Sequence, residues 1–351
     1  MTDISATQTL LLGFIVLLTL FLPFTWKKVE ENLEAFLFAM GLCAATISHV
    51  WSAHLIKEAL TEPLPITATV AGVGILFFFT RKWIKKGLDF LQNTLGRSGM
   101  FFAIVLILGM GSSLTTAIVA ALILAEVMTQ LSFERKFEVR LAILSCFAIG
   151  LGAALTPLGE PLSTILVSKL KGEPHNADFF YVLRQLGTWI IPGVLICSGL
   201  AAWQAKKAKL DTDSLEEASA ETPKDILIRA GKVYLFVMAL TFLGKGLTPL
   251  AEKYLLTLPS PLLYWVNSIS AILDNATLVA AEISPQMTDN QICYIVLGLV
   301  LSGGMLIPGN IPNIITASKL GIKAKEWAKF GLPFGAALML AYFILLLIFV
   351  R

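Results

Sequence analysis

The stretch SISAILDNATLVAA, residues 268–281, places Asp274 and Asn275 side by side within an otherwise apolar run. A charged acid at the centre of a lipid bilayer costs at least about 2.5–3.5 kcal/mol. We therefore expect such an acid either to bind an ion or a proton, or to form hydrogen bonds with main-chain groups that are not part of a helix. Both interpretations require this run to lie at membrane depth.

The composition of the chain is that of a membrane protein. Of its 351 residues 56% are hydrophobic and 15% are charged, and the mean hydropathy is +0.77. Soluble domains have about 45–50% apolar and 25% charged residues. The net charge of +3 does not suggest a nucleic-acid partner. No nucleotide-binding, metalloprotease or Ser/His/Asp pattern stands out, so we expect neither an enzyme nor a cofactor.

Ten apolar stretches divide into two kinds. A spanning helix needs about 20 apolar residues, and six uninterrupted runs are candidates: 7–25, 33–56, 65–81, 178–203, 230–251 and 328–350. Four further runs carry Gly, Pro, Asn or Asp in their interior: 99–130, 139–170, 259–284 and 289–320. Irregular backbone is tolerated at membrane depth only where it is enclosed by protein or lines a cavity. We therefore expect the four interruptions to surround a cavity.

The interruptions follow the same order in both halves of the chain, which indicates an internal repeat. Ser168-Lys169-Leu170 recurs as Ser318-Lys319-Leu320, and Val119-Ala120-Ala121 recurs as Val279-Ala280-Ala281. The predicted organisation places N-terminal scaffold helices before two repeats joined by a polar cytoplasmic linker: 1–64, 65–203 (repeat 1), 204–229 (linker) and 230–351 (repeat 2).

Basic residues predict the topology, because Lys and Arg favour the cytoplasmic side. Basic clusters lie on both sides of 99–130, so this run is expected to enter and leave the membrane as a re-entrant hairpin. The run 259–284 would be a second hairpin, entered from outside, and 139–170 and 289–320 would be broken spanning helices. The predicted fold is an all-α polytopic membrane protein with about eight spans, two opposed hairpins, inverted repeats and both termini outside. Secondary transporters share this plan.

Hairpin tips and broken helices that meet at mid-membrane would present small polar side chains to one point. The residues expected to bind an ion or substrate are Ser112, Ser113, Thr115, Thr116, Glu160, Ser163, Thr164, Asp274, Asn275, Thr277, Asn310 and Asn313. Small oxygen ligands of this kind suit Na⁺. Burial favours the neutral form of an acid, so Asp274 and Glu160 are candidates to exchange a proton for a cation. The alternative is that both acids only satisfy loosened backbone.

Three other charged residues lie within apolar runs. Glu126 and Glu282, on the hairpin arms, are expected either to line the path or to pair with another group or reach the interface. Lys245 is expected to be a counter-ion for an acid or, by extending its long side chain, to reach the membrane interface.

Three short segments within the interrupted runs resemble the paired signatures of the ion transporter superfamily. They are GEPLST (159–164), GNIPNI (309–314) and Asp274-Asn275-Ala276-Thr277. This superfamily includes NhaD-type sodium/proton antiporters, divalent anion/sodium symporters and arsenite permeases. The resemblance covers roughly 65–350 and is closest to a short branch of the superfamily described as cation transporters. It differs at the first tip, which reads GSSLTT in place of Ser-Asn-Thr. The resemblance implies a homodimer with Na⁺ at the hairpin tips, in which a transport domain moves against a fixed scaffold.

The function expected from these features is Na⁺/H⁺ antiport across the cytoplasmic (inner) membrane of a prokaryote, with the lipid bilayer, Na⁺ and H⁺ as partners. An alternative is a Na⁺-coupled symporter of a small anion such as a dicarboxylate, sulfate or arsenite. A third possibility is a membrane subunit without transport activity, against which the repeated interruptions argue.

Overall fold

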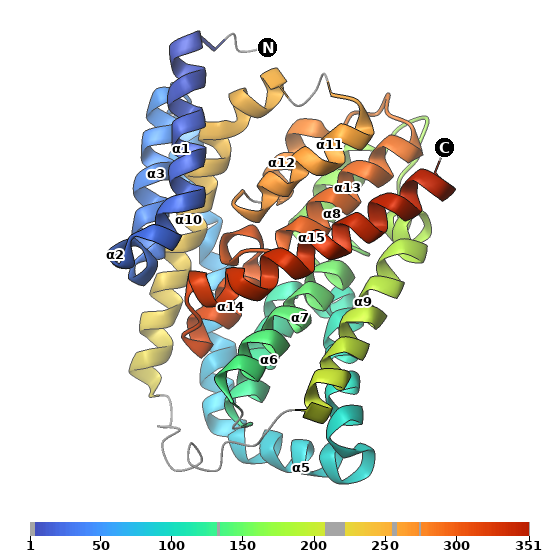
Figure 1. The fold of residues 1–351 in the computed structure, drawn as a ribbon. Coiled ribbons are helices and arrows are strands. Elements are labelled where there is room, and N and C mark those ends of the chain that lie inside the picture. Colours follow the sequence, from blue (N-terminus) through green and yellow to red (C-terminus); the bar gives the residue numbers. More distant parts are fainter. Residues whose placement is uncertain (1–3, 132–133, 208–221, 255–257, 274, 351) are drawn as a thin grey trace.

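The computed structural model describes residues 4–131, 134–207, 222–254, 258–273 and 275–350, and the regular secondary structure of these residues is helical (Figure 1). The helices of the first half are α1 (Ala6–Thr25), α2 (Lys27–Glu31), α3 (Leu33–Ile47), α4 (Ala53–Thr61), α5 (Pro63–Thr115), α6 (Ala117–Thr129), α7 (Arg135–Ala153), α8 (Pro161–Lys169) and α9 (Tyr181–Lys207). Those of the second half are α10 (Pro223–Tyr254), α11 (Ser260–Val266), the 3₁₀ helix η2 (Asn267–Ala271), α12 (Asn275–Glu282), α13 (Asp289–Gly303), the 3₁₀ helix η3 (Ile307–Gly309), α14 (Ile311–Leu320) and α15 (Ala324–Phe349).

Within the described ranges, 5 helical stretches are long and apolar enough to cross a membrane. They are α1, the stretch Ala53–Thr115 that joins α4 to α5, the part of α9 from Tyr181 to Lys206, α10 and α15. Helices α3 and α6 are apolar but shorter. The chain is therefore a helical membrane protein, as its composition predicts.

Two expected helices have different bounds in the structure. The run 33–56 stops at the end of α3, because His49 adopts a left-handed φ of 54° and Ser52 then caps α4 by accepting a hydrogen bond from the Leu55 amide at 3.0 Å. A residue in the left-handed region ends a helix. The run 65–81 continues into the first arm of 99–130 as α5, which consists of two helical segments that meet at a kink at Gly96 (φ 67°).

The helices form two groups (Figure 1). The flanking bundle consists of α1, α3, α4 and α10, and Figure 1 shows α1, α3 and α10 side by side. The main bundle consists of α6–α9 and α11–α15. Helix α5 joins the two, since it packs against α10 as well as against α6, α7 and α9.

Helices α3 and α10 approach closely because glycine faces the partner helix from both sides. A side-chain carbon at Gly41 would lie 2.9 Å from the Ala239 carbonyl oxygen, and one at Gly246 would lie 2.6 Å from the Ala44 carbonyl carbon. Small residues at such contacts allow membrane helices to pack by van der Waals contact. The Ser48 hydroxyl also donates to the Gly246 carbonyl oxygen at 2.5 Å. These contacts position α10, which forms one wall of the cavities described next.

Candidate functional site

The turn between α5 and α6 is held against the interruption of the next helix. Thr116 forms this turn with a φ of 131°, and its hydroxyl caps α6 by accepting from the Val119 amide at 3.2 Å. The Ala117 amide donates to the Gly159 carbonyl oxygen at 2.9 Å. The tip of the first helix pair therefore lies on the break between α7 and α8.

The second helix pair also lies against the second break, through the segment that precedes its turn. Helices α11 and η2 precede the turn and α12 follows it. Gly309, in the break between α13 and α14, lies so close to η2 that a side-chain carbon there would be 2.9 Å from both the Ser270 carbonyl oxygen and the Ala271 Cα. Asp274, the acid at this turn that the sequence singles out, lies outside the described residues.

The two breaks share one local geometry. Gly159 has no room for a side chain because it lies against the Ala153 carbonyl, and Gly309 lies against the Gly303 carbonyl in the same way. The next residues, Glu160 (φ −155°, ψ 158°) and Asn310 (φ −156°, ψ 146°), are both extended and both precede a helix with proline in its first turn. The spacing in sequence from Gly159 to Gly309, and from Glu160 to Asn310, is the same as that between the two Ser-Lys-Leu segments.

The two tips and the two breaks surround a cavity of about 510 Å³, which we call the central cavity. Its polar lining residues are Glu58, Glu62, Glu160, Thr241, Lys245, Thr248, Glu252, Asn275, Thr277 and Asn310. Four helices begin at its wall, since the first residues of α6, α8, α12 and α14 all line it. A helix N-terminus carries unpaired N–H groups and a partial positive charge. The central cavity thus brings helix N-termini and polar side chains together within a lining that also contains many apolar residues.

Acidic side chains predominate among the charged groups of the central cavity. Four glutamates and one lysine line it in the described part of the chain. The Lys245 ammonium lies 2.9 Å from a Glu58 carboxylate oxygen, and the Thr241 hydroxyl donates to Glu62 at 3.1 Å. Glu160 is 7% exposed and precedes α8. Lys245 is therefore paired with an acid, which is one of the two roles that the sequence allows it.

An amide in the wall of the central cavity is left without a partner. Asn275 is 4% exposed, and neither its Nδ2 nor its Oδ1 has a hydrogen-bond partner among the described residues. Gly303 lies beside it, since a side-chain carbon there would be 2.8 Å from Nδ2. Buried polar atoms are nearly always hydrogen-bonded, so this amide is placed to hold a ligand or water.

Four of the residues expected at the site lie together at the central cavity: Glu160, Asn275, Thr277 and Asn310. The following described residues do not line it: Ser112, Ser113, Thr115, Thr116, Ser163, Thr164 and Asn313. Their side chains are hydrogen-bonded to nearby backbone instead. For example, Ser163 donates to the Ala154 carbonyl at 2.5 Å, and Asn313 donates to the Gly303 and Leu306 carbonyls, both at 2.8 Å. Ser163, Thr164 and Asn313 bond in this way to backbone at the two breaks, whereas Ser113 and Thr115 bond to carbonyls of their own helix α5.

Three acids of the central cavity do not follow from the sequence pattern. Glu58 comes from α4, Glu62 from the residue before α5, and Glu252 from the last turns of α10. The signal that could have pointed to the first two is the pair of acids in KEALTEPLP (57–65), which lies between the apolar runs 33–56 and 65–81. They reach the cavity only because α4 packs against α10.

A smaller adjoining cavity of about 250 Å³ shares four lining residues with the central cavity: Glu58, Lys245, Thr248 and Glu252. It also includes Ser52 and His54, which precede or begin α4. The two cavities are thus neighbours beside α4.

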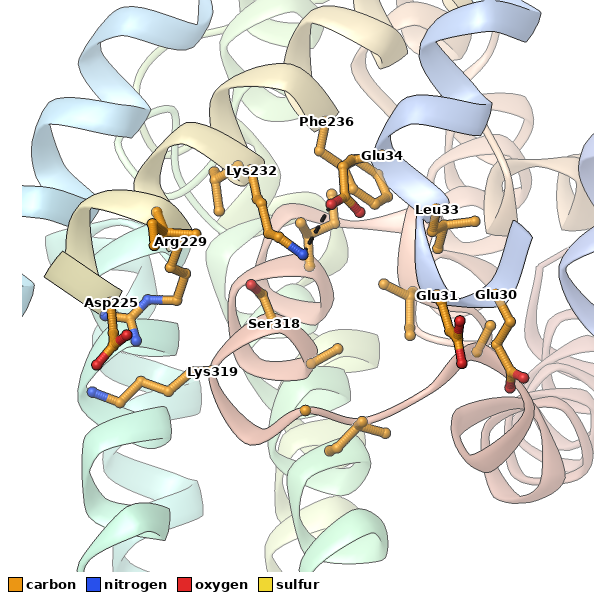
Figure 2. A pocket seen from close by; sticks show the side chains of 18 residues that line it. Glu30, Glu31, Leu33, Glu34, Asp225, Arg229, Lys232, Phe236, Ser318 and Lys319 are labelled. Atoms are coloured by element: carbon orange, nitrogen blue, oxygen red, sulfur yellow. Dashed lines mark ion pairs between the residues drawn. The ribbon is translucent and has the colours of Figure 1, made fainter. Parts of the chain in front are cut away.

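A second large cavity, of about 440 Å³, lies on the other half of α10 (Figure 2). We call it the charged cavity, because its lining contains Glu30, Glu31, Glu34, Asp225, Arg229, Lys232 and Lys319. Figure 2 shows the ion pair between Lys232 and Glu34, whose N–O distance is 3.1 Å. The residues of α10 that line this cavity lie between Asp225 and Phe236, whereas those that line the central cavity lie between Val237 and Glu252.

An apolar cluster lies between the two cavities. We call it the septum, and it consists of Val70, Ala121, Leu122, Ala230, Val233, Val237 and Ile315. Val233 lines the charged cavity and Val237 lines the central cavity. The septum joins α5 and α10 to α6 and α14, so it is a contact between the flanking and main bundles that contains only aliphatic side chains.

The two acids on the arms of the helix pairs are both buried but differ in their partners. Glu126 on α6 pairs with Lys319 at 2.6 Å and Arg81 at 3.2 Å, and it accepts from Gln130 at 2.9 Å. Glu282 on α12 accepts from the Asn267 amide at 2.9 Å. Neither residue lines the central cavity.

A family model described as "Protein of unknown function (DUF1646)" matches residues 9–349. No curated protein matches the chain.

Proposed function

The chain belongs to the DUF1646 family, whose description assigns no function, and from its site we propose that it is a secondary active transporter that exchanges Na⁺ for protons. The observation that carries the proposal is the central cavity, where four helix N-termini, two helix breaks and a surplus of carboxylates meet. Glu160, Asn275, Thr277 and Asn310 would bind the ion together with Asp274 from the second tip, and Glu160 and Asp274 would exchange it for protons.

The balance of charge in the central cavity supports a cation. The described lining has four carboxylates and one ammonium, a formal balance of −3 when all are ionised. Each helix N-terminus contributes about half a positive charge, so four of them offset about two of these negative charges. The remainder is about one negative charge, and protonation of one carboxylate would remove it. A proton and a Na⁺ would therefore compete for the same small surplus of negative charge.

The matching geometry of the two breaks supports the finer fold that the sequence predicts. In this proposal the chain consists of inverted repeats, each with a re-entrant hairpin (99–130, 259–284) and a broken helix (139–170, 289–320). The number of about eight spans, the inner-membrane location and the outward termini belong to the same proposal. Inverted repeats place their substrate site near the bilayer midplane, where broken helices meet.

The arrangement of the cavities supports an elevator-type motion. The central and charged cavities both lie between the flanking and main bundles, on opposite halves of α10. The septum between them offers aliphatic contacts without directional bonds, so the main bundle can shift along it at a low cost in hydrogen bonds. Such a shift would move the ion-binding residues from the central cavity toward the charged cavity. The homodimer remains an expectation from the superfamily resemblance.

The second candidate is a Na⁺-coupled symporter of a small anion such as a dicarboxylate, sulfate or arsenite. The specific observation in its favour is the convergence of four helix N-termini on the central cavity. Helix N-termini are ready-made anion sites. The symporter becomes the better candidate if the glutamates of the cavity are protonated when substrate binds.

The test is ion exchange by the purified full-length chain in lipid vesicles with an internal pH indicator and a preformed pH gradient. For the antiporter, added Na⁺ collapses the gradient in a buffer without any other substrate anion, and K⁺ and choline serve as controls. For the symporter, Na⁺ moves only after a dicarboxylate, sulfate or arsenite is added. Vesicles in which no alkali cation and none of these anions is transported would overturn both candidates.

A further inference from the structure

The buried acid Glu282 lacks the charged partners that the buried acid Glu126 has. Each residue is 1% exposed. Glu126 has two cations within ion-pair distance, Lys319 and Arg81. Across the described residues, Glu282 forms no ion pair, and its one hydrogen bond comes from the neutral Asn267 amide.

The immediate contacts of Glu282 leave two oxygen atoms unused. Its Oε2 accepts from Asn267 Nδ2 at 2.9 Å, while its Oε1 has no hydrogen-bond partner among the described residues. The Oδ1 of Asn267 also has none in this part of the chain. Asn267 is 0% exposed, so the acid and the amide form a pair sealed from solvent.

The neighbouring helices do not supply a counter-charge. Helix α12 packs against α8, α10 and α13, whose titratable side chains on the adjacent turns are Lys169, Glu252, Cys293 and Tyr294. The Lys169 ammonium donates to the main-chain carbonyls of Ala280 and Ile283, the latter at 3.1 Å, rather than to the Glu282 carboxylate. Lys169 therefore offsets the partial negative charge at the C-terminal end of α12 and does not neutralise the Glu282 carboxylate.

Physical chemistry favours the neutral acid in this setting. An ionised carboxylate that is buried with one hydrogen bond loses far more solvation than a neutral polar group loses. A protonated carboxyl gains an O–H donor, and the unused Oδ1 of its own partner Asn267 is an acceptor. One proton on Glu282 therefore removes the buried charge and supplies the donor that the pair lacks.

We propose that Glu282 is a proton-binding site, held as a carboxylic acid by Asn267 in this conformation. The site is separate from the central cavity, whose lining on α12 stops at Ala280. Binding forms an O–H bond on the Glu282 carboxylate with a proton taken from water. Release returns that proton to water and leaves a carboxylate, which requires α12 to shift so that water reaches it. As far as transport is concerned, this inference rests on the proposed function, in which Glu282 would carry a proton in the opposite direction to Na⁺.

Infrared spectroscopy of the purified full-length protein tests the protonation state directly. At neutral pH the spectrum of the wild type should contain the carbonyl stretch of a protonated carboxylic acid, and Glu282→Gln should lack that contribution. Gln has the same shape as the neutral acid and keeps an acceptor for Asn267, so this variant should fold. Asp89→Asn, which changes an exposed acid on α5, should leave the band unchanged. Identical spectra of wild type and Glu282→Gln would overturn the proposal.

The dependence of thermal stability on pH is a second readout. Raising the pH ionises the buried acid of the wild type, so its stability should fall relative to that of Glu282→Gln, which cannot ionise. A Glu282→Gln variant that is less stable than the wild type by the same amount at every pH would contradict a neutral acid.

Vesicle transport separates this inference from the proposed function. Loss of the pH dependence of Na⁺ exchange in Glu282→Gln supports the transport role, and an unchanged pH profile overturns that role while the spectra still decide the proton site. If the wild type exchanges no ions, the proposed function fails, and the infrared comparison remains a test of Glu282.

Discussion

The carboxylate of Glu126 on α6 and the ammonium of Lys319 on α14 lie 2.6 Å apart, with side chains that are 2% and 4% exposed. The pair joins α6 to the end of α14, and Arg81 on α5 adds a further cation at 3.2 Å. A buried ion pair adds little over a well-packed apolar pair, but a buried charge without its partner is strongly unfavourable.

Lys319→Met should destabilise the protein by about 3–5 kcal/mol, because it leaves the buried Glu126 carboxylate with only Arg81 as a cationic partner. The measurement is the free energy of unfolding in detergent with a chemical denaturant. The double variant Glu126→Leu/Lys319→Met should recover much of this loss, since it removes both buried charges. A double variant that loses the sum of the two single effects would contradict a coupled pair.

Glu160→Gln should weaken Na⁺ binding about 10- to 100-fold, because hydrogen bonds and contacts to a charged group are worth about 1.5–3 kcal/mol. The measurement is the Na⁺ concentration that gives half-maximal exchange in vesicles. Thr164→Val, four residues after Glu160 and outside the central cavity, is the control and should leave that concentration within about twofold. Equal effects of both substitutions would remove Glu160 from the site.

Asn313→Ala should reduce stability without changing ion dependence. The side chain of Asn313 donates to the Gly303 and Leu306 carbonyls at 2.8 Å and is 0% exposed. Leaving buried carbonyls unsatisfied costs about 1–3 kcal/mol. Thermal unfolding and the Na⁺ dependence of exchange are measured on the same preparation. A normal unfolding temperature with a shifted Na⁺ dependence would instead make Asn313 a ligand.

Gly159→Ala and Gly309→Ala should each destabilise the protein by at least about 1–3 kcal/mol, because an added methyl group at either position meets backbone that cannot move aside. Gly172→Ala is the control, since a side-chain carbon at Gly172 would meet no atom within 4 Å. Thermal unfolding of the three variants provides the comparison. Tolerance of alanine at one break but not at the other would argue against a shared geometry.

The ion pair at the start of α9 should make a contribution to protein stability that varies with pH in the acid range. The Arg184 guanidinium donates to Asp178 at 3.0 Å and thereby lowers the pKa of Asp178. A lowered folded-state pKa contributes stability above the ordinary Asp value of about 3.9, and this contribution is lost as the pH falls through the folded-state value. Arg184→Gln should therefore be slightly less stable than the wild type near neutral pH and equally stable in strong acid. A difference that grows on acidification would contradict this sign.

The sequence by itself determined the class of the protein and the position of its interruptions. Apolar runs of spanning length predict a helical membrane protein, because hydropathy is a local property of the chain. Gly159 with Pro161 and Gly309 with Pro312 predict where α8 and α14 begin, because the backbone limits of these residues are also local. The recurrence of Ser-Lys-Leu indicates which break corresponds to which.

Only the tertiary structure decided which polar side chains meet. Ser163 and Glu160 are three residues apart, yet the first is hydrogen-bonded to the Ala154 carbonyl and the second lines the central cavity. Glu58 reaches the same cavity from a segment more than a hundred residues away in sequence, because α4 packs on α10. The direction of a side chain depends on how distant helices pack around it, and no local pattern contains that information.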